Sequence, residues 1–300
     1  MTNITLKQLR YFEALARHGH FGRAADTCAI SQPALSVQIK DMETELGAPL
    51  FERAARHVRL TSIGEDLAGH VRQILQSVDD LADVARAAQD GTMARLRLGV
   101  IPTIAPYLLP KLIGQLTRAY PDLDVHLRET MTARLVEELF EGRIDAAIVA
   151  LPIGDPGLTE LPLFDESLVL VRPATDAAIP VPSRAELTQM RMLLLEEGHC
   201  FRDQALSFCN MPSAMPRDGL DGSALSTLVQ MVGAGLGVTL IPEMAVSVET
   251  GAAAVCVAKL DGPQPQRTVG IVWRKTNPLR AQLQEIRHIA RTAAGHARNE

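Results

Sequence analysis

A proline-free stretch from Ile63 to about Gln89 places the strongest constraint on how this chain of 300 residues folds. Apolar residues recur along it in alternating steps of four and three, at Leu67, Val71, Ile74, Val78, Leu81, Ala85 and Ala88. This spacing is the heptad pattern of a long helix with one narrow apolar stripe. We expect a helix that pairs with a partner helix and joins two folded regions. The alternative is an ordinary amphipathic helix lying on its own domain.

The composition, with 47% hydrophobic and 22% charged residues, is that of a globular protein large enough for two or more domains. The N-terminal residues contain no apolar signal segment, and no run of residues resembles a membrane span. We therefore expect a cytoplasmic protein without membrane contact. Its formal net charge is −5, yet residues 1–60 hold eight Lys or Arg against six Asp or Glu. Any contact with nucleic acid must therefore be local.

Helical spacing of apolar residues predicts three helices in this first region. Gly19 ends the first helix, and a short second helix covers residues 21–27. Ser31 is typical of an N-cap, Pro33 fits an early helical position, and Gly47 ends the third helix.

The third helix has a polar face formed by Gln32, Ser36 and Lys40, which are short enough to approach base edges and phosphates in a major groove. After it, residues 50–61 alternate as a β-hairpin wing, where Arg53 would contact the DNA backbone. The pattern alone leaves two interpretations open: a DNA-reading face, or a solvated face without a partner.

The literal residues of this region are more informative than their pattern. The run S-Q-P-A-L-S-x-Q-I-K-D-M-E from Ser31 to Glu43, with L-F-E-R up to Arg53, closely resembles the winged helix-turn-helix of LysR-type transcriptional regulators. The resemblance implies that the third helix binds double-stranded DNA through Ser31, Gln32, Pro33, Ser36 and Lys40, with Arg53 on the backbone. It also implies that the long helix forms a homodimer that binds palindromic promoter sites.

Strand and helix patterns alternate in the next part of the chain. We expect strands at residues 96–101, 125–129 and 146–150, with helices at 107–120 and 134–140 between them. Such alternation favours a mostly parallel, doubly wound sheet. A second lobe would begin near Ser167, and a strand at 269–273 would return to the first lobe before a C-terminal helix.

Ligands in such α/β folds bind at the carboxyl ends of strands, where Thr103 follows the first strand and Thr132 the second. The predicted fold is α/β in three parts. These are a winged helix-turn-helix DNA-binding domain at residues 4–61, a linker and dimerisation helix at 62–90, and a two-lobed, periplasmic-binding-protein-like (type 2) sensor domain at 91–300.

The run G-H-C-F-R-D-Q-A-L-S-F-C at residues 198–209 holds the one close pair among four cysteines. Cys200 lies beside His199, and a neighbouring cation favours the reactive thiolate. We therefore expect Arg202 and Asp203, just after it, to tune this thiol. The alternative is that these cysteines, like most free ones, are small buried hydrophobic residues.

If residues 202–209 are helical, Cys200 and Cys209 lie on opposite faces, roughly 13 Å apart along the axis. A disulfide needs Cα atoms within about 7 Å, so this bond requires local structure to melt. Cys28 and Cys256 have apolar surroundings and are expected to be buried and structural. We expect no metal and no cofactor, because no C-x-x-C or Cys/His cluster accompanies the pair.

The cysteine motif, with I-P-T-I-A-P-Y-L-L-P at 101–110 and Q-R-T-V-G-I-V-W at 266–273, resembles the peroxide-sensing regulators of the LysR family along essentially the whole chain. The resemblance implies that Cys200 reacts with hydrogen peroxide and that Cys209 is its disulfide partner. It implies that peroxide is held by a set of four residues: His199, Thr103, Thr132 and Arg267. It further implies a dimer or tetramer whose packing changes on oxidation, with RNA polymerase as a partner.

We therefore expect a transcriptional regulator that is not an enzyme, acting as activator or repressor of oxidative-stress genes. Two other functions are weighed against it. One is a LysR-type regulator that senses a small carboxylate, with incidental cysteines. The other is a thiol peroxidase, which would leave the DNA-binding region unexplained.

Overall fold

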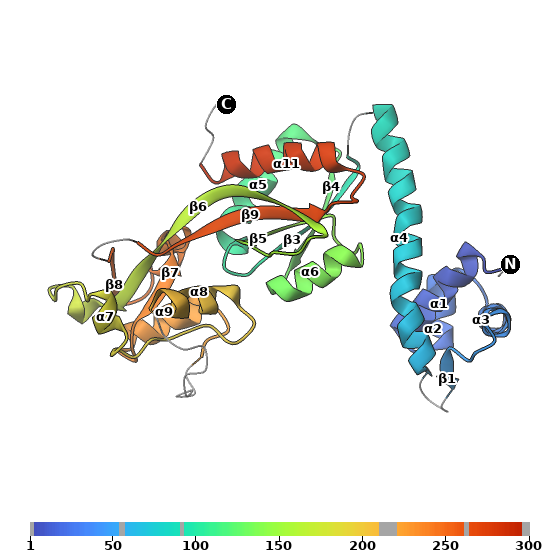
Figure 1. The fold of residues 1–300 in the computed structure, drawn as a ribbon, viewed down its shortest axis with the longest axis horizontal. Coiled ribbons are helices and arrows are strands. Elements are labelled where there is room, and N and C mark those ends of the chain that lie inside the picture. Colours follow the sequence, from blue (N-terminus) through green and yellow to red (C-terminus); the bar gives the residue numbers. More distant parts are fainter. Residues whose placement is uncertain (1–2, 54–57, 91–92, 210–220, 261–263, 296–300) are drawn as a thin grey trace. The chain divides into compact units, whose positions relative to one another are not determined.

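The fold is described by a computed structural model, which covers residues 3–53, 58–90, 93–209, 221–260 and 264–295 (Figure 1). The chain divides into two compact units, one formed by Met1–Gln89 with Glu141–Arg143 and the other by the remaining residues. Within the described ranges, no helix has the length and apolar character needed to cross a membrane.

The first unit is a winged helix-turn-helix followed by a long helix. Its elements are α1 (Leu6–His18), α2 (Phe21–Thr27), α3 (Gln32–Leu46), β1 (Phe51–Arg53), β2 (Val58–Leu60) and α4 (Ser62–Asp90). Thr5 and Gln8 form a capping box on α1, and Gly19 ends that helix in the left-handed conformation, with φ of 59°. β1 and β2 pair antiparallel, so the three predicted helices and the predicted hairpin are confirmed. Residues 54–57, at the predicted hairpin's tip, lie outside the described ranges.

The core of this unit orients α3. Leu35, Ile39 and Met42 are buried against α1 and α2, which leaves the opposite face of the helix in solvent. Burial of three such side chains contributes several kcal/mol, at roughly 1.5–3 kcal/mol each. The helix therefore cannot rotate to hide its polar face.

The apolar residues of α4 differ in what covers them. Val71 is buried against the winged-helix core, and Leu67 packs partly against it. Ile74 and Leu81, in contrast, are 46% and 69% exposed. The first positions of the predicted stripe thus lie on their own domain, as the alternative interpretation has it, whereas Ile74 and Leu81 are exposed. The side chains of residues 82–90 lie outside the described part.

The second unit is built on a seven-stranded sheet of order β4-β3-β5-β9-β6-β7, with β8 paired to β6. The strands are β3 (Arg95–Val100), β4 (Asp124–Glu129), β5 (Ala146–Leu151), β6 (Leu158–Pro173), β7 (Thr239–Pro242), β8 (Val255–Ala258) and β9 (Gln266–Arg274). β4, β3 and β5 are parallel, as predicted. The expectation of a mostly parallel sheet is wrong beyond β5. The long strand β6 leads into the second lobe, and β9 returns from it, antiparallel to both β5 and β6.

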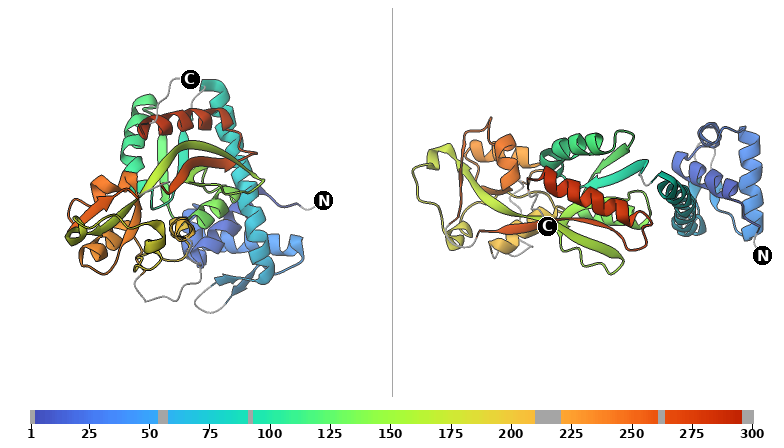
Figure 2. Two further views of the ribbon diagram at one scale, coloured as in Figure 1. Left: turned by 60° about the vertical axis from the view of Figure 1, so that its left-hand side comes forward. Right: turned by 90° about the horizontal axis from the view of Figure 1, so that it is seen from above.

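Helices cover both faces of the first-lobe sheet. The helices of the second unit are α5 (Ala105–Ala119), α6 (Thr132–Phe140), α7 (Arg184–Leu187), α8 (Cys200–Phe208), α9 (Leu225–Gly233), α10 (Val246–Glu249) and α11 (Arg280–Ala293). Short 3₁₀ turns lie at Ala174–Asp176 and Glu243–Ala245. α5 and α11 lie side by side on one face, and α6 lies on the other (Figures 1 and 2). Gly99 in β3 permits this, since a Cβ there would lie 2.5 Å from Cδ2 of Leu135 in α6.

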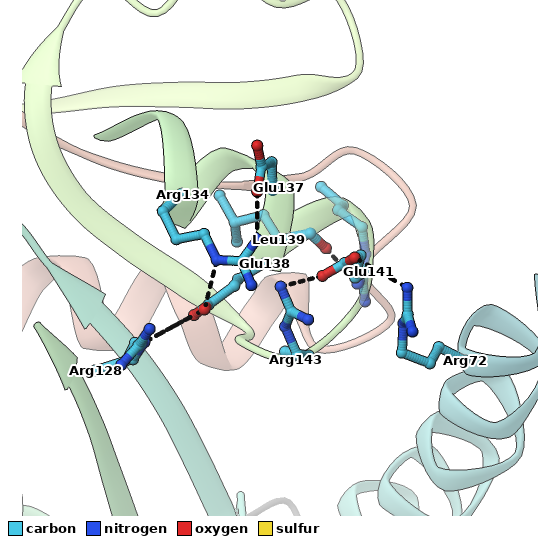
Figure 3. A network of polar contacts seen from close by, with 9 residues as sticks. Arg72, Arg128, Arg134, Glu137, Glu138, Leu139, Glu141 and Arg143 are labelled. Carbon is cyan, nitrogen blue, oxygen red and sulfur yellow. Dashed lines mark hydrogen bonds and ion pairs between the residues drawn. The ribbon is translucent and has the colours of Figure 1, made fainter. Parts of the chain in front are cut away.

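A buried carboxylate fixes α6 against β4. Glu138 is 5% exposed and accepts hydrogen bonds from Nε of Arg128 at 3.2 and 3.3 Å. Nε of Arg134 lies 3.4 Å from the same carboxylate, so two cations converge on it (Figure 3). Arg274 of β9 donates to the carbonyl oxygen of Leu139 at 2.6 Å. These contacts hold in place the helix whose N-terminus borders the site described below.

Leu81→Glu tests whether the exposed stripe of α4 pairs two subunits. Leu81 is 69% exposed, so a charge there changes the folding stability of a single subunit by only about 0.5 kcal/mol. If two α4 helices pair through Leu81, the same charge is buried between them and opposes their association. We predict that the variant sediments as a smaller species than the wild type while its circular dichroism spectrum shows that each subunit is still folded. Gln73→Glu, also exposed on α4, controls for the added charge. A Leu81→Glu protein of wild-type mass would contradict this role.

Candidate functional site

The cysteine motif meets the first lobe at the ends of two parallel strands. A narrow crevice there is lined by Ile101, Pro102, Thr103, Met131, Thr132, Gly198, His199, Cys200 and Phe201. β3 and β4 are parallel neighbours, so the segments that follow them meet at one edge of the sheet. The structure therefore brings Thr103, Thr132 and His199 together around Cys200, as the sequence predicts.

Gly198 makes this meeting possible. Its φ of +95° is a backbone conformation that residues with a side chain rarely adopt. A Cβ at this position would also lie 2.6 Å from Sδ of Met131. Only glycine satisfies both conditions, and the turn it forms places His199 and Cys200 against the start of α6.

Cys200 is the first residue of α8 and is half-buried. The backbone N–H groups at a helix N-terminus carry partial positive charge, which stabilises a negatively charged sulfur. His199 is the N-cap residue, and burial lowers its pKa. The imidazole is therefore neutral near pH 7 and serves the site as a hydrogen-bonding group rather than as a cation.

Arg202, a predicted tuning residue, is buried with its guanidinium turned to other partners. Its NH1 donates to the carbonyl oxygen of Leu195 at 2.8 Å and to the Asp221 carboxylate at 3.2 Å. These bonds hold α8 to the segments on either side of it. Asp203 is exposed on the first turn. The described contacts give Arg202 a structural role, and its effect on Cys200, like that of Asp203, stays a prediction.

Arg267 acts on the crevice through Thr103. Its NH1 donates to Oγ1 of Thr103 at 2.8 Å, and its NH2 donates to the carbonyl oxygen of the same residue at 3.0 Å. Because the threonine oxygen accepts from Arg267, its own proton is directed elsewhere. Thr103 is thus prepared as a donor, while Arg267 is not among the residues that line the crevice.

Thr132 presents a buried hydroxyl that has no hydrogen-bond partner among the described residues. Leaving such a group unsatisfied costs about 1–3 kcal/mol, which is why it is rare. The hydroxyl lies at the first residue of α6, in the same crevice as Cys200. A small polar ligand bound there would supply the missing partner.

The sequence predictions did not single out Gln204, which lies on α8 but does not line the crevice. It lies four residues after Cys200, so both residues are on the same side of α8. Its Oε1 is buried and has no hydrogen-bond partner in the part of the chain that the structure describes. The spacing within the cysteine motif was the signal that could have identified it.

Cys209 lies at the other end of α8, in the hydrophobic core of the second lobe. It is fully buried, and this burial raises the pKa of its thiol. The helix between Cys200 and Cys209 is intact and both thiols are free, which confirms the predicted helix. At about 1.5 Å of rise per residue, such a helix separates the two residues by roughly 13 Å along its axis. Cys28 and Cys256 are half-buried, so the predicted full burial is wrong, although Cys28 does pack partly against the core of the first unit.

A larger cavity of about 390 Å³ lies between the lobes and shares Thr103 and His199 with the crevice. Three carboxylate residues line it, Glu129, Glu196 and Glu249. Negative charge at these positions opposes binding of a second negative charge. The cavity is therefore poorly suited to a small organic carboxylate.

The predicted DNA-reading face of α3 is accessible to solvent. Exposed or half-buried side chains there are Ser31, Gln32, Pro33, Ser36 and Lys40. Oγ of Ser31 accepts from the backbone N–H of Ala34 at 3.4 Å, so this residue caps the helix as well. Val37, which the sequence predictions did not single out, is 56% exposed on the same helix. The side chain of Arg53 lies outside the described part.

Two protein families match the chain. Residues 6–65 match the family described as bacterial regulatory helix-turn-helix protein, lysR family. Residues 89–295 match the LysR substrate binding domain.

Relatives and solved structures point in the same direction. The chain is 39% identical to the hydrogen peroxide-inducible genes activator of Dickeya chrysanthemi, over 94% of this chain and 93% of the relative. It is 38% identical to the DNA-binding transcriptional dual regulator OxyR of Escherichia coli, with the same coverage. It is similar to a full-length OxyR variant from Pseudomonas aeruginosa, with a TM-score of 0.79, 36% identity and coverage of 100% and 99%. A peroxide-bound OxyR mutant from Corynebacterium glutamicum has a TM-score of 0.66, 33% identity and coverage of 97% and 92%.

The order in which the thiols are alkylated tests the described geometry. Cys200 is half-buried at a helix N-terminus, whereas Cys209 is fully buried with a raised pKa, so less of it is thiolate at pH 7. We predict that iodoacetamide modifies Cys200 in the native protein about tenfold faster or more, as measured by peptide mass spectrometry. Denatured protein, in which both thiols are accessible, serves as the control. Faster modification of Cys209 would contradict the structure.

Proposed function

This chain belongs to the LysR family of bacterial transcriptional regulators and is a hydrogen-peroxide sensor of the OxyR type, and on this basis we propose that Cys200 and Cys209 form its redox switch. The observation that carries the proposal is the unsatisfied hydroxyl of Thr132 beside Cys200. The crevice is narrow, so a ligand that binds beside Cys200 has to be very small.

In the first step, the Cys200 thiolate attacks one oxygen of hydrogen peroxide. A sulfur–oxygen bond forms, the oxygen–oxygen bond breaks, and the second oxygen leaves with the electron pair as hydroxide. The cysteine is oxidised to sulfenic acid and the peroxide is reduced. Thr103, held as a donor by Arg267, supports charge developing on the leaving oxygen, together with Thr132 and neutral His199.

In the second step, the Cys209 sulfur attacks the sulfenic sulfur of Cys200. A disulfide forms and water leaves with the former peroxide oxygen, so that one peroxide and two thiols give one disulfide and two waters. The intact α8 separates the two sulfurs, and this step therefore requires the helix to unwind. Unwinding would remove Phe201 and Ala205 from the second-lobe core, and it would change the surface of that lobe.

We propose that this rearrangement alters the packing of a homodimer or homotetramer that is paired through α4. The altered packing would change how two α3 helices bind palindromic promoter DNA, through Ser31, Gln32, Pro33, Ser36, Lys40 and Arg53, and how RNA polymerase is engaged. The protein would work in the cytoplasm as a regulator rather than as an enzyme. Each subunit then reacts once per signal instead of turning over peroxide.

Cys200→Ser separates DNA binding from sensing. The substitution removes the nucleophile but leaves α3 untouched, so we predict wild-type DNA affinity and no change of footprint after one equivalent of hydrogen peroxide. Thiol counting before and after the addition should show a loss of two thiols per chain in the wild type and no such loss in the variant. Cys256→Ser, outside the site, should respond like the wild type. A Cys200→Ser protein that still switches would refute the assignment.

Thr132→Val tests the unsatisfied hydroxyl directly. Valine has the same shape without the buried polar group, so we predict that the variant is as stable as the wild type, or more stable by about 1 kcal/mol. Oxidation of Cys200 by peroxide should nevertheless slow by about tenfold or more, because a hydrogen bond to the reacting ligand is lost. Thermal melts and stopped-flow kinetics measure the two effects. Thr130→Val, which is next to the site but not in the crevice, provides the control.

A further inference from the structure

We propose that Glu166 is a positioning residue of the peroxide site, which holds Arg267 in the orientation that makes Thr103 a hydrogen-bond donor. The inference rests on the proposed function of the crevice around Cys200. It adds a residue from the opposite side of the buried arginine, on a strand that the sequence predictions did not connect with the site.

Glu166 and Arg267 face each other on paired strands, β6 and β9. Nε of Arg267 donates to Oε2 of Glu166 at 2.7 Å, and NH2 lies 2.7 Å from the same oxygen. The side chains are 5% and 0% exposed, so the pair is shielded from water. In such surroundings a carboxylate that contacts two nitrogens of the planar guanidinium restricts its rotation.

The carboxylate is itself held from a second direction. Its Oε1 accepts from the backbone N–H of Met244 at 3.1 Å, in the 3₁₀ turn that follows β7. Both oxygens of Glu166 are therefore occupied, one by β9 and one by the second lobe. The carboxylate has little freedom to turn, and it passes this constraint to Arg267.

Arg267 in turn contacts both sides of the crevice. It donates to the hydroxyl and the carbonyl oxygen of Thr103, and its Cζ lies 5.5 Å from the ring centroid of Phe201, the residue after Cys200. A rotated guanidinium would lose the bond to the threonine hydroxyl, whose proton could then turn away from the crevice. Misplacement of a positioning group by about 1 Å can slow a reaction by about 100-fold.

Glu166 does not line the crevice, so it does not contact the reacting atoms. Its effect must pass through Arg267, which separates a positioning role from a catalytic one. A purely structural role would alter the whole fold around Cys200. A positioning role alters only the reaction that needs Thr103, which is the reduction of peroxide.

Glu166→Gln in the full chain distinguishes these roles, because it keeps an acceptor for Met244 and removes the charge. Stopped-flow oxidation of Cys200 by hydrogen peroxide should slow by about tenfold or more, while its alkylation by iodoacetamide keeps the wild-type rate. Asp165→Asn is the matched control: Asp165 is the neighbour on β6 and accepts from Thr268 at 2.6 Å. An unchanged peroxide rate in Glu166→Gln, or an equal loss in both reactions, would overturn the inference.

Glu166→Asp covers the case in which Glu166→Gln does not fold with a buried, unpaired arginine. It keeps the charge, but it is one methylene shorter and cannot reach both Arg267 and the Met244 amide. A selective loss of the peroxide rate supports the inference, and a wild-type rate overturns it. The wild-type protein distinguishes failure of the proposed function from failure of this inference. If peroxide does not oxidise Cys200 in the wild type, the proposed function fails. If wild type and variant are oxidised equally fast, only the role of Glu166 is refuted.

Discussion

An uninterrupted helix keeps the two thiols of this protein apart. Cys200 begins α8 and Cys209 follows its last residue, so their separation is fixed by the rise of the helix rather than by flexible loops. The same helix buries Phe201, Ala205 and Leu206 in the second lobe. A disulfide between the two ends of α8 therefore cannot form unless these side chains leave the core. The proposed switch depends on this coupling, because a disulfide between neighbouring thiols would leave the fold unchanged.

The reactive end of α8 is completed by residues from distant parts of the chain. Parallel pairing of β3 with β4 brings the segments after both strands to one edge, where Thr103 and Thr132 meet the turn at Gly198. Behind them, Arg267 is paired with the buried Glu166 and donates hydrogen bonds to the hydroxyl and the carbonyl oxygen of Thr103. Pairing of the charge keeps its burial from being prohibitive. The site thus belongs to both lobes and to the two strands that connect them.

Local signals explain why so much of the fold was predictable. Ser31 and Gly47 delimit α3 through their own capping chemistry, and heptad spacing identified α4. The antiparallel course of β9 was not predictable, because strand pairing depends on partners far along the chain. Glu166 was missed for the same reason, since it lies 101 residues from Arg267 and carries no motif. Likewise, only the packed structure shows which side of α4 is covered by its own domain.

In the proposed mechanism, burial of Cys209 in the second-lobe core also sets the timing of the response. After Cys200 is oxidised, its sulfenic acid must persist until α8 opens, and local opening of a packed helix is governed by its own free energy. During that interval, small cellular thiols compete with Cys209 for the same sulfur, and excess peroxide drives further oxidation. The strength with which the core retains one helix therefore decides how long the sensor holds an intermediate that other molecules can intercept.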